Sequence, residues 1–313
     1  MKHLLSIHDL TTEETKQILT LAQDLKTKQK QGIPHPFLKN KTLGMIFSKS
    51  STRTRVSFEV GMYQLGGHAL FLSSNDIQLG RGETIYDTAN VLSRYLDGIM
   101  IRTYDQKDVE DLAKYGSIPI INGLTDLLHP CQALTDMLTI AEKKGNLEGL
   151  KLAYLGDGNN MAHSLLYAGA KLGMQVFVAT PEGFECQQEI VANAKEDAKK
   201  TGAVIDVSHD PLRAVANADA VYTDTWISMG QSGSKESRLA TFHSYQVNGK
   251  MMRHAKEDAI FLHCLPAYRG YEVTKEVIDG PQSVVFDEAE NRLHTQKAIM
   301  ALLMADKRKE EFI

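Results

Sequence analysis

Short apolar runs alternate with longer segments of mixed apolar and polar residues along most of the chain. The runs are rich in β-branched and aromatic residues, and the segments between them have the period of amphipathic helices. The runs expected to form strands are KTLGMIF (41–47), GHALFL (67–72), GIMIR (98–102), IPIIN (118–122), KLAYLG (151–156), QVFVAT (175–180), AVIDV (203–207), DAVYTD (219–224), AIFLHC (259–264) and SVVFD (283–287). Strands that alternate with helices in this way form parallel sheets covered by helices on both faces. The pattern therefore predicts an α/β fold.

The predicted strands fall into two groups, separated by the helical stretch HPCQALTDMLTIAEKKGNLEG (129–149). This stretch ends in a charged, Gly-containing link, where a domain boundary is expected. We predict two doubly wound parallel-sheet domains linked by helices, one over residues 1–146 and one over 147–290. The segment 291–313 has helical composition and no following strand. It is expected to be a C-terminal helix that packs back on the first domain.

Composition narrows the classes of function without identifying one. The chain has 313 residues, more than a single core usually serves, and its formal net charge is −4. So small a charge does not favour nucleic acid or an anionic membrane as a partner. The cysteines Cys131, Cys186 and Cys264 are few and widely spaced, which argues against disulfides and a structural zinc site. The N-terminus turns polar after a few residues, so a soluble cytoplasmic protein is expected.

The stretch FSKSSTRTR (47–55) concentrates positive charge and hydroxyl groups between a predicted strand and a predicted helix. The helix is expected over Thr54 to Leu65, with Val56, Val60 and Tyr63 on one side and a Gly-Gly pair as its end. FSKSSTRTR is therefore the turn that leads from the strand into the helix.

A turn of this composition is suited to a phosphate-like dianion. The first N–H groups of a helix lack intrahelical partners and the helix dipole is positive there. Arg53 and Arg55 add cations beside the hydroxyl groups. A simple N-cap with solvated arginines is the alternative, but a cap needs only one hydroxyl. The glycines of a nucleotide-binding phosphate loop are missing, so a nucleotide is not implied.

Three further polar stretches stand where predicted strands end. Arg102 ends GIMIR, HPCQ (129–132) follows IPIIN, and HCLP (263–266) ends AIFL. Taken singly, each is better explained as a solvated arginine, a core histidine or an apolar cysteine. Open α/β sheets bind ligands at the carboxyl ends of their strands, however. The shared location of all three therefore favours a ligand site.

FSKSSTRTR, HPCQ and HCLP, in this order and spacing, resemble the family of aspartate and ornithine carbamoyltransferases over essentially the whole chain. DTWISMG (224–230) resembles the ornithine-binding loop, and GDGNNMAHS and LGRGET also resemble the ornithine branch. The resemblance implies transfer of the carbamoyl group of carbamoyl phosphate to the δ-amine of L-ornithine, giving L-citrulline and phosphate in arginine metabolism, either in biosynthesis or in arginine breakdown. It also implies a homotrimer with active sites at the subunit interfaces.

The resemblance assigns residues to carbamoyl phosphate. They are Ser51, Thr52, Arg53, Thr54, Gln78, Arg102, His129, Gln132, Cys264, Leu265 and Arg292. The turn from Ser51 to Thr54 would cradle the phosphate, while Arg102, His129 and Thr54 would stabilise the carbonyl oxygen. Gln132 and the backbone carbonyl of Leu265 or of its neighbour would accept from the carbamoyl NH2, and Arg292 would close on the substrate. Gln78 would come from the neighbouring subunit.

The residues that the resemblance assigns to ornithine are Asn160, Asp224, Ser228 and Met229, with Asp224 on the α-ammonium. Arg102, His129 and Cys264 are the expected catalytic residues. Cys264 would act by position or charge beside the reacting amine, and simple packing is its alternative. No metal or other cofactor is expected, because the acyl donor is already activated and needs only orientation and charge stabilisation.

Other functions stay open at this point. An oxidoreductase built on GDGNNMAHS would lack the third glycine of a dinucleotide fingerprint, where Met161 stands. A sister carbamoyltransferase would use aspartate, putrescine or an acylated ornithine, although Asp224 suits a free α-ammonium. A non-catalytic ligand sensor should lack one or more of the site residues. Tyr268 and Tyr271 depart from the family pattern just beyond HCLP.

Overall fold

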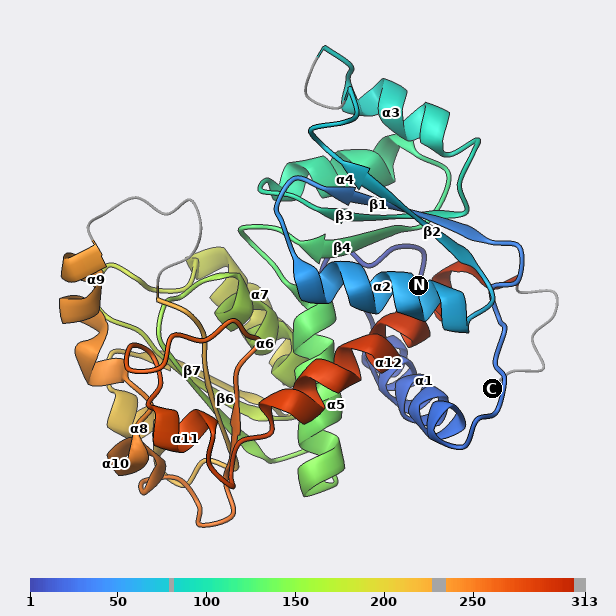
Figure 1. Cartoon of the computed structure of the whole chain (residues 1–313). Coiled ribbons are helices and arrows are strands. Elements are labelled where there is room, and N and C mark those ends of the chain that lie inside the picture. The colour runs from blue at the N-terminus through green and yellow to red at the C-terminus, as the bar shows by residue number, and fades with distance from the viewer. Residues whose placement is uncertain (79–81, 227–234, 307–313) are drawn as a thin grey trace. The chain divides into compact units, whose positions relative to one another are not determined.

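The computed structural model describes residues 1–78, 82–226 and 235–306 (Figure 1). The chain divides into two compact units. Unit 1 comprises Met1–Leu134 together with the chain from Asn291 onward, and unit 2 comprises Thr135–Glu290. The sequence pattern places the first boundary at residue 146, after the linking helix, whereas this division falls inside that helix, α5 (Pro130–Lys144).

Unit 1 is built on a four-stranded parallel sheet with the strand order β2-β1-β3-β4. Its strands are β1 (Thr42–Phe47), β2 (His68–Ser73), β3 (Gly98–Arg102) and β4 (Ile120–Leu124). Its helices are α1 (Thr12–Lys30), α2 (Thr52–Gln64), α3 (Ile85–Leu92), α4 (Gln106–Tyr115), the start of α5 and most of α12 (Val285–Met304). The expected strands in this half of the chain are all present, within about two residues of their predicted bounds.

Alternation along β3 shows why helices cover both faces of this sheet. Ile99 and Ile101 join a buried cluster with residues of α3 and α4. A Cβ atom on Gly98, which points the other way, would lie 2.9 Å from Sδ of Met304 on α12. In Figure 1, α3 and α4 accordingly lie on one side of the sheet, and α2 and α12 on the other. Unit 1 is therefore doubly wound, as predicted.

The C-terminal helix packs on unit 1 through close backbone approach and buried polar contacts. A Cβ atom on Gly61 of α2 would lie 2.8 Å from Cε of Met300. Lys26 of α1 donates a hydrogen bond of 2.7 Å to Oδ1 of Asn291, and both residues are buried. These contacts confirm the expectation that the last helix returns to the first half of the chain.

Unit 2 is built on a five-stranded parallel sheet with the order β7-β6-β5-β8-β9. The strands are β5 (Lys151–Leu155), β6 (Gln175–Ala179), β7 (Val204–Ser208), β8 (Ala220–Thr223) and β9 (Ile260–Leu262). The helices that lie wholly in this unit are α6 (Asn160–Lys171), α7 (Gln188–Thr201), α8 (Pro211–Val215), α9 (Lys235–Phe242), α10 (Gly249–Met252) and α11 (Lys275–Ile278). Within the described residues, no helix of either unit is long and apolar enough to span a membrane.

Unit 2 also buries both faces of its sheet. Ala179 belongs to a large apolar cluster that includes residues of α8 to α11. Val176, three positions earlier on β6, faces α6, where a Cβ atom on Gly169 would lie only 2.1 Å from its Cγ2. A glycine on α6 thus lets the helix approach the sheet closely.

One predicted strand is wrong. SVVFD contributes only a single bridge, between Ser283 and Phe261, and α12 begins at Val285. Asp287 and Glu288 stand in the first turn of that helix, where negative charge favours the positive end of the dipole. The acidic residues, rather than the apolar run, decide the local structure.

Helix α2 begins two residues earlier than predicted, at Thr52, with Ser51 as its N-cap. The side that carries Val56, Val60 and Tyr63 is exposed, and the side chain of Tyr63 is 81% exposed. The buried residues of α2 are instead Thr54, Phe58, Gly61 and Met62. An apolar stripe at helical spacing thus faces away from the core of unit 1.

The close approach at Gly169 makes unit 2 sensitive to a single added methyl group. Gly169→Ala should lower the free energy of unfolding by roughly 1–3 kcal/mol, because overlap with Val176 outweighs the better helix propensity of alanine. Thermal unfolding measures the change, with the exposed Ala192→Ser on α7 as a control that should stay within about 0.5 kcal/mol. An unchanged or raised melting temperature for Gly169→Ala would contradict this packing.

Candidate functional site

In unit 1, the sequence-predicted residues gather at the carboxyl ends of parallel strands. The turn after β1 carries Ser51 to Thr54, Arg102 is the last residue of β3, and His129 stands between β4 and α5. The backbone N–H of Ser48 donates to the carbonyl oxygen of Arg102 at 2.8 Å, which ties the first turn to the end of β3. The strand order thus brings together groups that lie far apart in the sequence.

The turn after β1 presents the start of helix α2. The side chain of Ser51 accepts a hydrogen bond from the N–H of Thr54 at 3.2 Å. The N–H groups of the first helical turn, at Thr52 and Arg53, have no carbonyl of the same helix before them and point toward its N-terminal end. These donors lie on the positive end of the dipole of a helix that runs from Thr52 to Gln64.

Arg292 of α12 joins this group through two hydrogen bonds. Its Nη2 donates to Oγ1 of Thr54 at 2.7 Å, and its Nη1 donates to Oε1 of Gln132 at 2.9 Å. All three side chains are buried, with Thr54 and Gln132 fully inaccessible. Three of the residues predicted for carbamoyl phosphate, from three separate segments, are therefore in direct contact.

Positive charge dominates the site in unit 1. Burial lowers the pKa of His129 well below its usual range, and the charges of Arg292, Arg102 and Arg53 lower it further. The imidazole is therefore neutral at physiological pH and can donate only one N–H. A neutral donor among three guanidinium groups can hold a dianion and an oxygen that gains negative charge.

Three other residues of the motifs in unit 1 lie outside this group of contacts. Arg55, which the sequence pattern groups with Arg53, pairs with Glu59 at 3.0 Å and lies over the ring of Phe71 at 3.8 Å. Gln78 is exposed on the connection between β2 and α3. Cys131 of HPCQ donates to the carbonyl oxygen of Asn122, and burial raises its pKa to about 12. Its thiol is thus part of the core.

In unit 2, Asp224 follows β8 and lies 7% exposed. Its carboxylate accepts from Nδ2 of Asn159 at 2.9 Å, from the N–H of Thr225 at 2.7 Å and from the thiol of Cys264 at 3.2 Å. These three donors are neutral, so they orient the carboxylate without cancelling its charge. Such a group is suited to an ammonium ion.

Cys264 follows β9 and is held as a thiol. Burial raises its pKa well above the usual range, and the nearby charges of Asp224 and Glu288 raise it further. A protonated thiol is a donor toward Asp224 and a poor nucleophile. The geometry therefore favours a positional role for Cys264 over covalent catalysis.

The HCLP turn is shaped from within by His263. The N–H of Leu265 donates to Nδ1 of His263 at 2.9 Å, so the ring proton is on Nε2, which donates to Glu272 at 3.2 Å. Leu265 has a φ of 58°, a left-handed conformation that costs a residue with a side chain about 1–2 kcal/mol. The fully buried imidazole thus stabilises a strained turn.

A metal ion could be considered for one group of side chains in unit 2. Ligand atoms of Asp224, His263 and Cys264 all lie within 4.8 Å of one another. Both ring nitrogens of His263 are already hydrogen bonded, to Leu265 and Glu272, so a metal at this imidazole would have to displace one of them.

The ornithine residues predicted from the sequence are only partly accessible to comparison. Asn160 is the first residue of α6, while Ser228 and Met229 lie outside the described residues. Asn159, which was not predicted, caps α6 with its Oδ1 and contacts Asp224 with its Nδ2. The sequence did contain a signal for Asn159: it stands in GDGNN immediately before a predicted helix, and an Asn at that place is a typical N-cap.

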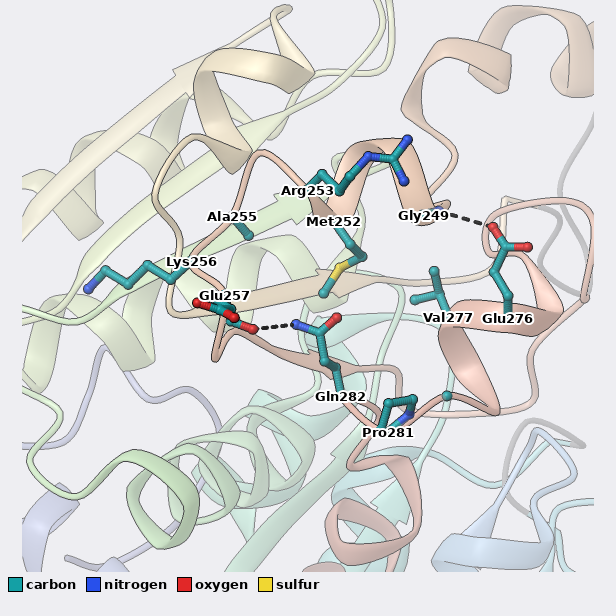
Figure 2. Close-up of a pocket in the computed structure, with 11 residues that line it drawn as sticks. Gly249, Met252, Arg253, Ala255, Lys256, Glu257, Glu276, Val277, Pro281 and Gln282 are labelled. Carbon is teal, nitrogen blue, oxygen red and sulfur yellow. Dashed lines mark hydrogen bonds between the residues drawn. The ribbon is translucent and has the colours of Figure 1, made fainter.

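A separate hollow of about 410 Å³ lies in unit 2 beside α10 and α11 (Figure 2). It is bordered by Ala255 and Glu257, which precede β9, so it is at the amino end of that strand rather than the carboxyl end. Its polar side chains are partly engaged, since Glu276 accepts from the N–H of Gly249 and Gln282 donates to the carbonyl oxygen of Glu257. The hollow is not the site that the sequence motifs describe.

Models of two family domains match the chain. Residues 2–142 match the carbamoyl-P binding domain of aspartate/ornithine carbamoyltransferase, and residues 148–303 match the Asp/Orn binding domain. The matches cover the segments that carry the two groups of polar residues.

Individual relatives agree with the domain models. An ornithine carbamoyltransferase of Caldicellulosiruptor saccharolyticus is 60% identical over 97% of this chain and 98% of its own length. A solved ornithine carbamoyltransferase from Pyrococcus furiosus is 58% identical, covers 97% of both chains and has a TM-score of 0.94. The anabolic enzyme from Campylobacter jejuni is 42% identical with a TM-score of 0.91, covering 97% of this chain and 99% of its own. The chain therefore belongs to the aspartate/ornithine carbamoyltransferase family.

Proposed function

We propose that this chain transfers the carbamoyl group of carbamoyl phosphate to the δ-amine of L-ornithine, forming L-citrulline and phosphate. The observation that carries the proposal is the contrast between the two groups of polar residues. Unit 1 concentrates Arg53, Arg102 and Arg292 around a helix start, whereas unit 2 presents Asp224 among neutral donors. An anionic acyl donor and a cationic amino acid are the substrates that this division of charge fits.

The roles in unit 1 follow from where charge develops. Attack on the carbamoyl carbon places negative charge on the carbonyl oxygen and then on the departing phosphate. Arg102, His129 and Thr54 stabilise the oxygen, while Arg53 and the N–H groups of the first turn of α2 hold the phosphate. Arg292 exchanges its contacts with Thr54 and Gln132 for contacts with the substrate. This exchange frees Gln132 to accept from the carbamoyl NH2.

The roles in unit 2 concern ornithine and the turn after β9. Asp224 binds the α-ammonium, and the Asn160 side chain together with amides of the loop that begins at Asp224 binds the carboxylate. The δ-amine must lose its proton before it attacks, since a free alkyl ammonium has a pKa near ~10.4. Cys264 lies beside the reacting δ-amine, and the carbonyl group of Leu265 accepts from the carbamoyl NH2, in a turn whose geometry His263 holds. Ser228 and Met229 complete the proposed ornithine contacts.

A homotrimer is part of the proposal. Val56, Val60 and Tyr63 of α2 lie exposed on unit 1, as do Leu70 and Phe71 of the edge strand β2. An apolar surface of this kind on a helix and an unpaired strand edge is typical of a protein interface. Gln78, on the connection that leaves β2, would then complete the phosphate site of a neighbouring subunit.

We also propose a cytoplasmic, biosynthetic enzyme. None of the cysteines in the described residues forms a disulfide, which fits a reducing compartment. A Pyrococcus furiosus relative, 58% identical over 97% of this chain, is named as an anabolic ornithine carbamoyltransferase.

Substitutions of two arginines of α2 distinguish a specific phosphate site from a general effect of surface charge. Arg53→Ala should lower kcat/KM for carbamoyl phosphate by about 10- to 100-fold, because a charge-assisted hydrogen bond is lost. Arg55→Ala, whose guanidinium pairs with Glu59, should stay within about threefold. Initial rates of citrulline formation with carbamoyl phosphate varied measure both. Equal effects of the two substitutions would contradict the assignment of Arg53.

Asp224→Asn keeps the shape of the side chain and removes its charge. We expect the KM for ornithine to rise at least about tenfold while the KM for carbamoyl phosphate changes little. Rates measured with each substrate varied in turn at saturating levels of the other distinguish the two. If the ornithine dependence is unchanged, Asp224 does not bind the α-ammonium.

Tyr63→Asp should disrupt the trimer, because it places a charge in the proposed apolar interface. Analytical ultracentrifugation should give about three times the chain mass of 34.8 kDa for the unmodified protein and a smaller mass for the variant. Leu212→Asp, at a half-exposed position in unit 2, is the matched control and should remain trimeric. A monomeric unmodified protein, or a Tyr63→Asp variant of unchanged mass, would contradict this interface.

A further inference from the structure

Two acidic side chains outside the assigned site are in contact in the interior of unit 2. Glu288 stands in the first turn of α12 and is 1% exposed, and Asp136 of α5 is fully inaccessible. Their side chains are hydrogen bonded to each other. Two buried carboxyl groups in hydrogen-bond contact cannot both be ionised without a large cost in free energy, so one proton is shared between them.

Glu288 is hydrogen bonded to residues that shortly precede Asp224 and Cys264 in the sequence. Oε2 of Glu288 accepts from the backbone N–H of His263 at 2.9 Å, and Oε1 accepts from the hydroxyl of Tyr222 at 3.4 Å. His263 immediately precedes Cys264, and Tyr222 stands two positions before Asp224. Glu288 therefore links β8 to the residue that follows β9.

The groups that face Glu288 come from every element packed against it. Asp136 belongs to α5, Tyr222 to β8 and His263 to the end of β9. The imidazole of His263 is hydrogen bonded to Glu272, whereas the backbone N–H of His263 donates to Glu288. Burial keeps the hydroxyl of Tyr222 protonated by raising its pKa well above the usual range, and the charge of Asp136 adds to this shift. Asp224 and Cys264 act on Tyr222 as well.

We propose that Glu288 and Asp136 form a positioning pair, joined by one proton, that holds the contact between Asp224 and Cys264 in the geometry needed for ornithine. The inference rests on the function proposed above. Neither carboxyl group touches a substrate in this account. Their effect is transmitted through the backbone of His263 and the hydroxyl of Tyr222 to a contact of 3.2 Å.

Substitutions at Glu288 test this role by kinetics. Glu288→Ala removes the acceptor for the His263 N–H, so kcat/KM for ornithine should fall about tenfold or more, with the KM for carbamoyl phosphate within about twofold. Glu288→Gln keeps a carbonyl oxygen for that N–H and gains an amide that donates to Asp136. It should recover to within about threefold of the unmodified protein.

A matched control separates positioning from general loss of stability. Asp197 of α7 is also buried in unit 2 and pairs with Lys171 of α6 at 2.9 Å. Asp197→Asn should lower the melting temperature while leaving the ornithine constants unchanged. The kinetic constants of Glu288→Ala and Asp197→Asn are measured side by side, each at the same interval below the melting temperature of that variant. A defect in ornithine use confined to Glu288→Ala then reports positioning.

A second measurement needs no substrate. Burial raises the pKa of Glu288 to about 7 from an ordinary value near 4.5, so the folded state binds a proton that the unfolded state releases between these values. The contribution of this group to stability is therefore present below about pH 4.5 and lost as pH rises to 7. The melting temperature of the unmodified protein minus that of Glu288→Gln should fall between about pH 5 and 8, by about 3 °C or more. Asp136→Asn, which also removes the shared proton, should behave like Glu288→Gln.

The outcomes are distinct. Wild-type ornithine kinetics in Glu288→Ala, or a Glu288→Gln variant as impaired as the alanine variant, would overturn the positioning role. A melting-temperature difference independent of pH would overturn the shared proton. If the unmodified protein makes no citrulline at all, the proposed function fails, whereas the thermal measurement still tests the pair.

Discussion

Three arginines brought to one end of a parallel sheet are the constraint on which the chemistry of unit 1 depends. Arg53, Arg102 and Arg292 all act on the pKa of His129, and together with burial they keep that imidazole neutral. Buried guanidinium groups are stable only if an anion or neutral hydrogen-bond acceptors lie beside them. In the described structure Arg292 uses Thr54 and Gln132 in this way. In the proposed function, a phosphorylated substrate takes the place of these internal hydrogen bonds.

In unit 2 the central charged group is a carboxylate, and its hydrogen-bond donors are neutral. The carboxylate of Asp224 accepts hydrogen bonds from a backbone N–H, an amide and a thiol, none of which carries a positive charge. The same low-polarity surroundings that strengthen an ammonium contact keep Cys264 protonated. The strained turn at Leu265 and the pair of Glu288 with Asp136 lie next to the strand ends that carry these groups, and we propose that the pair holds them in place. Strain and buried charge accumulate where the reaction is proposed to occur.

Much of this arrangement can be predicted from the sequence because it depends on local signals. The turn from Ser51 to Thr54 was recognisable because it carries a row of hydroxyls beside guanidinium groups where a simple cap needs one hydroxyl, and the structure places that turn at a helix start. Arg102 and His129 were predictable from their places at strand ends. The family motifs supplied the assignment of Arg292, although its contact with Thr54 spans 238 positions and no local pattern indicates it.

The errors have equally physical reasons. Apolar periodicity correctly places Val56 and Tyr63 on one side of α2 but does not say what covers that side, and both residues are exposed on unit 1. The run SVVFD has strand composition, yet the acidic residues that follow start a helix. Asn159 and Glu288 are hydrogen bonded to residues of other elements, Asp224 and Tyr222. The sequence does not show these partners, because they depend on the order of the strands in the sheet. Sequence patterns locate elements, whereas tertiary contacts decide which polar groups meet.

The central claim is that the chain joins carbamoyl phosphate to free ornithine. The most direct measurement is colorimetric detection of carbamoylated product by the purified protein with carbamoyl phosphate and, in parallel, ornithine, acetylornithine, putrescine or aspartate. Product with ornithine alone is the predicted result. Product with a different amine would contradict the role of Asp224 while leaving the anion site intact, and no product with any amine would contradict the enzymatic function itself.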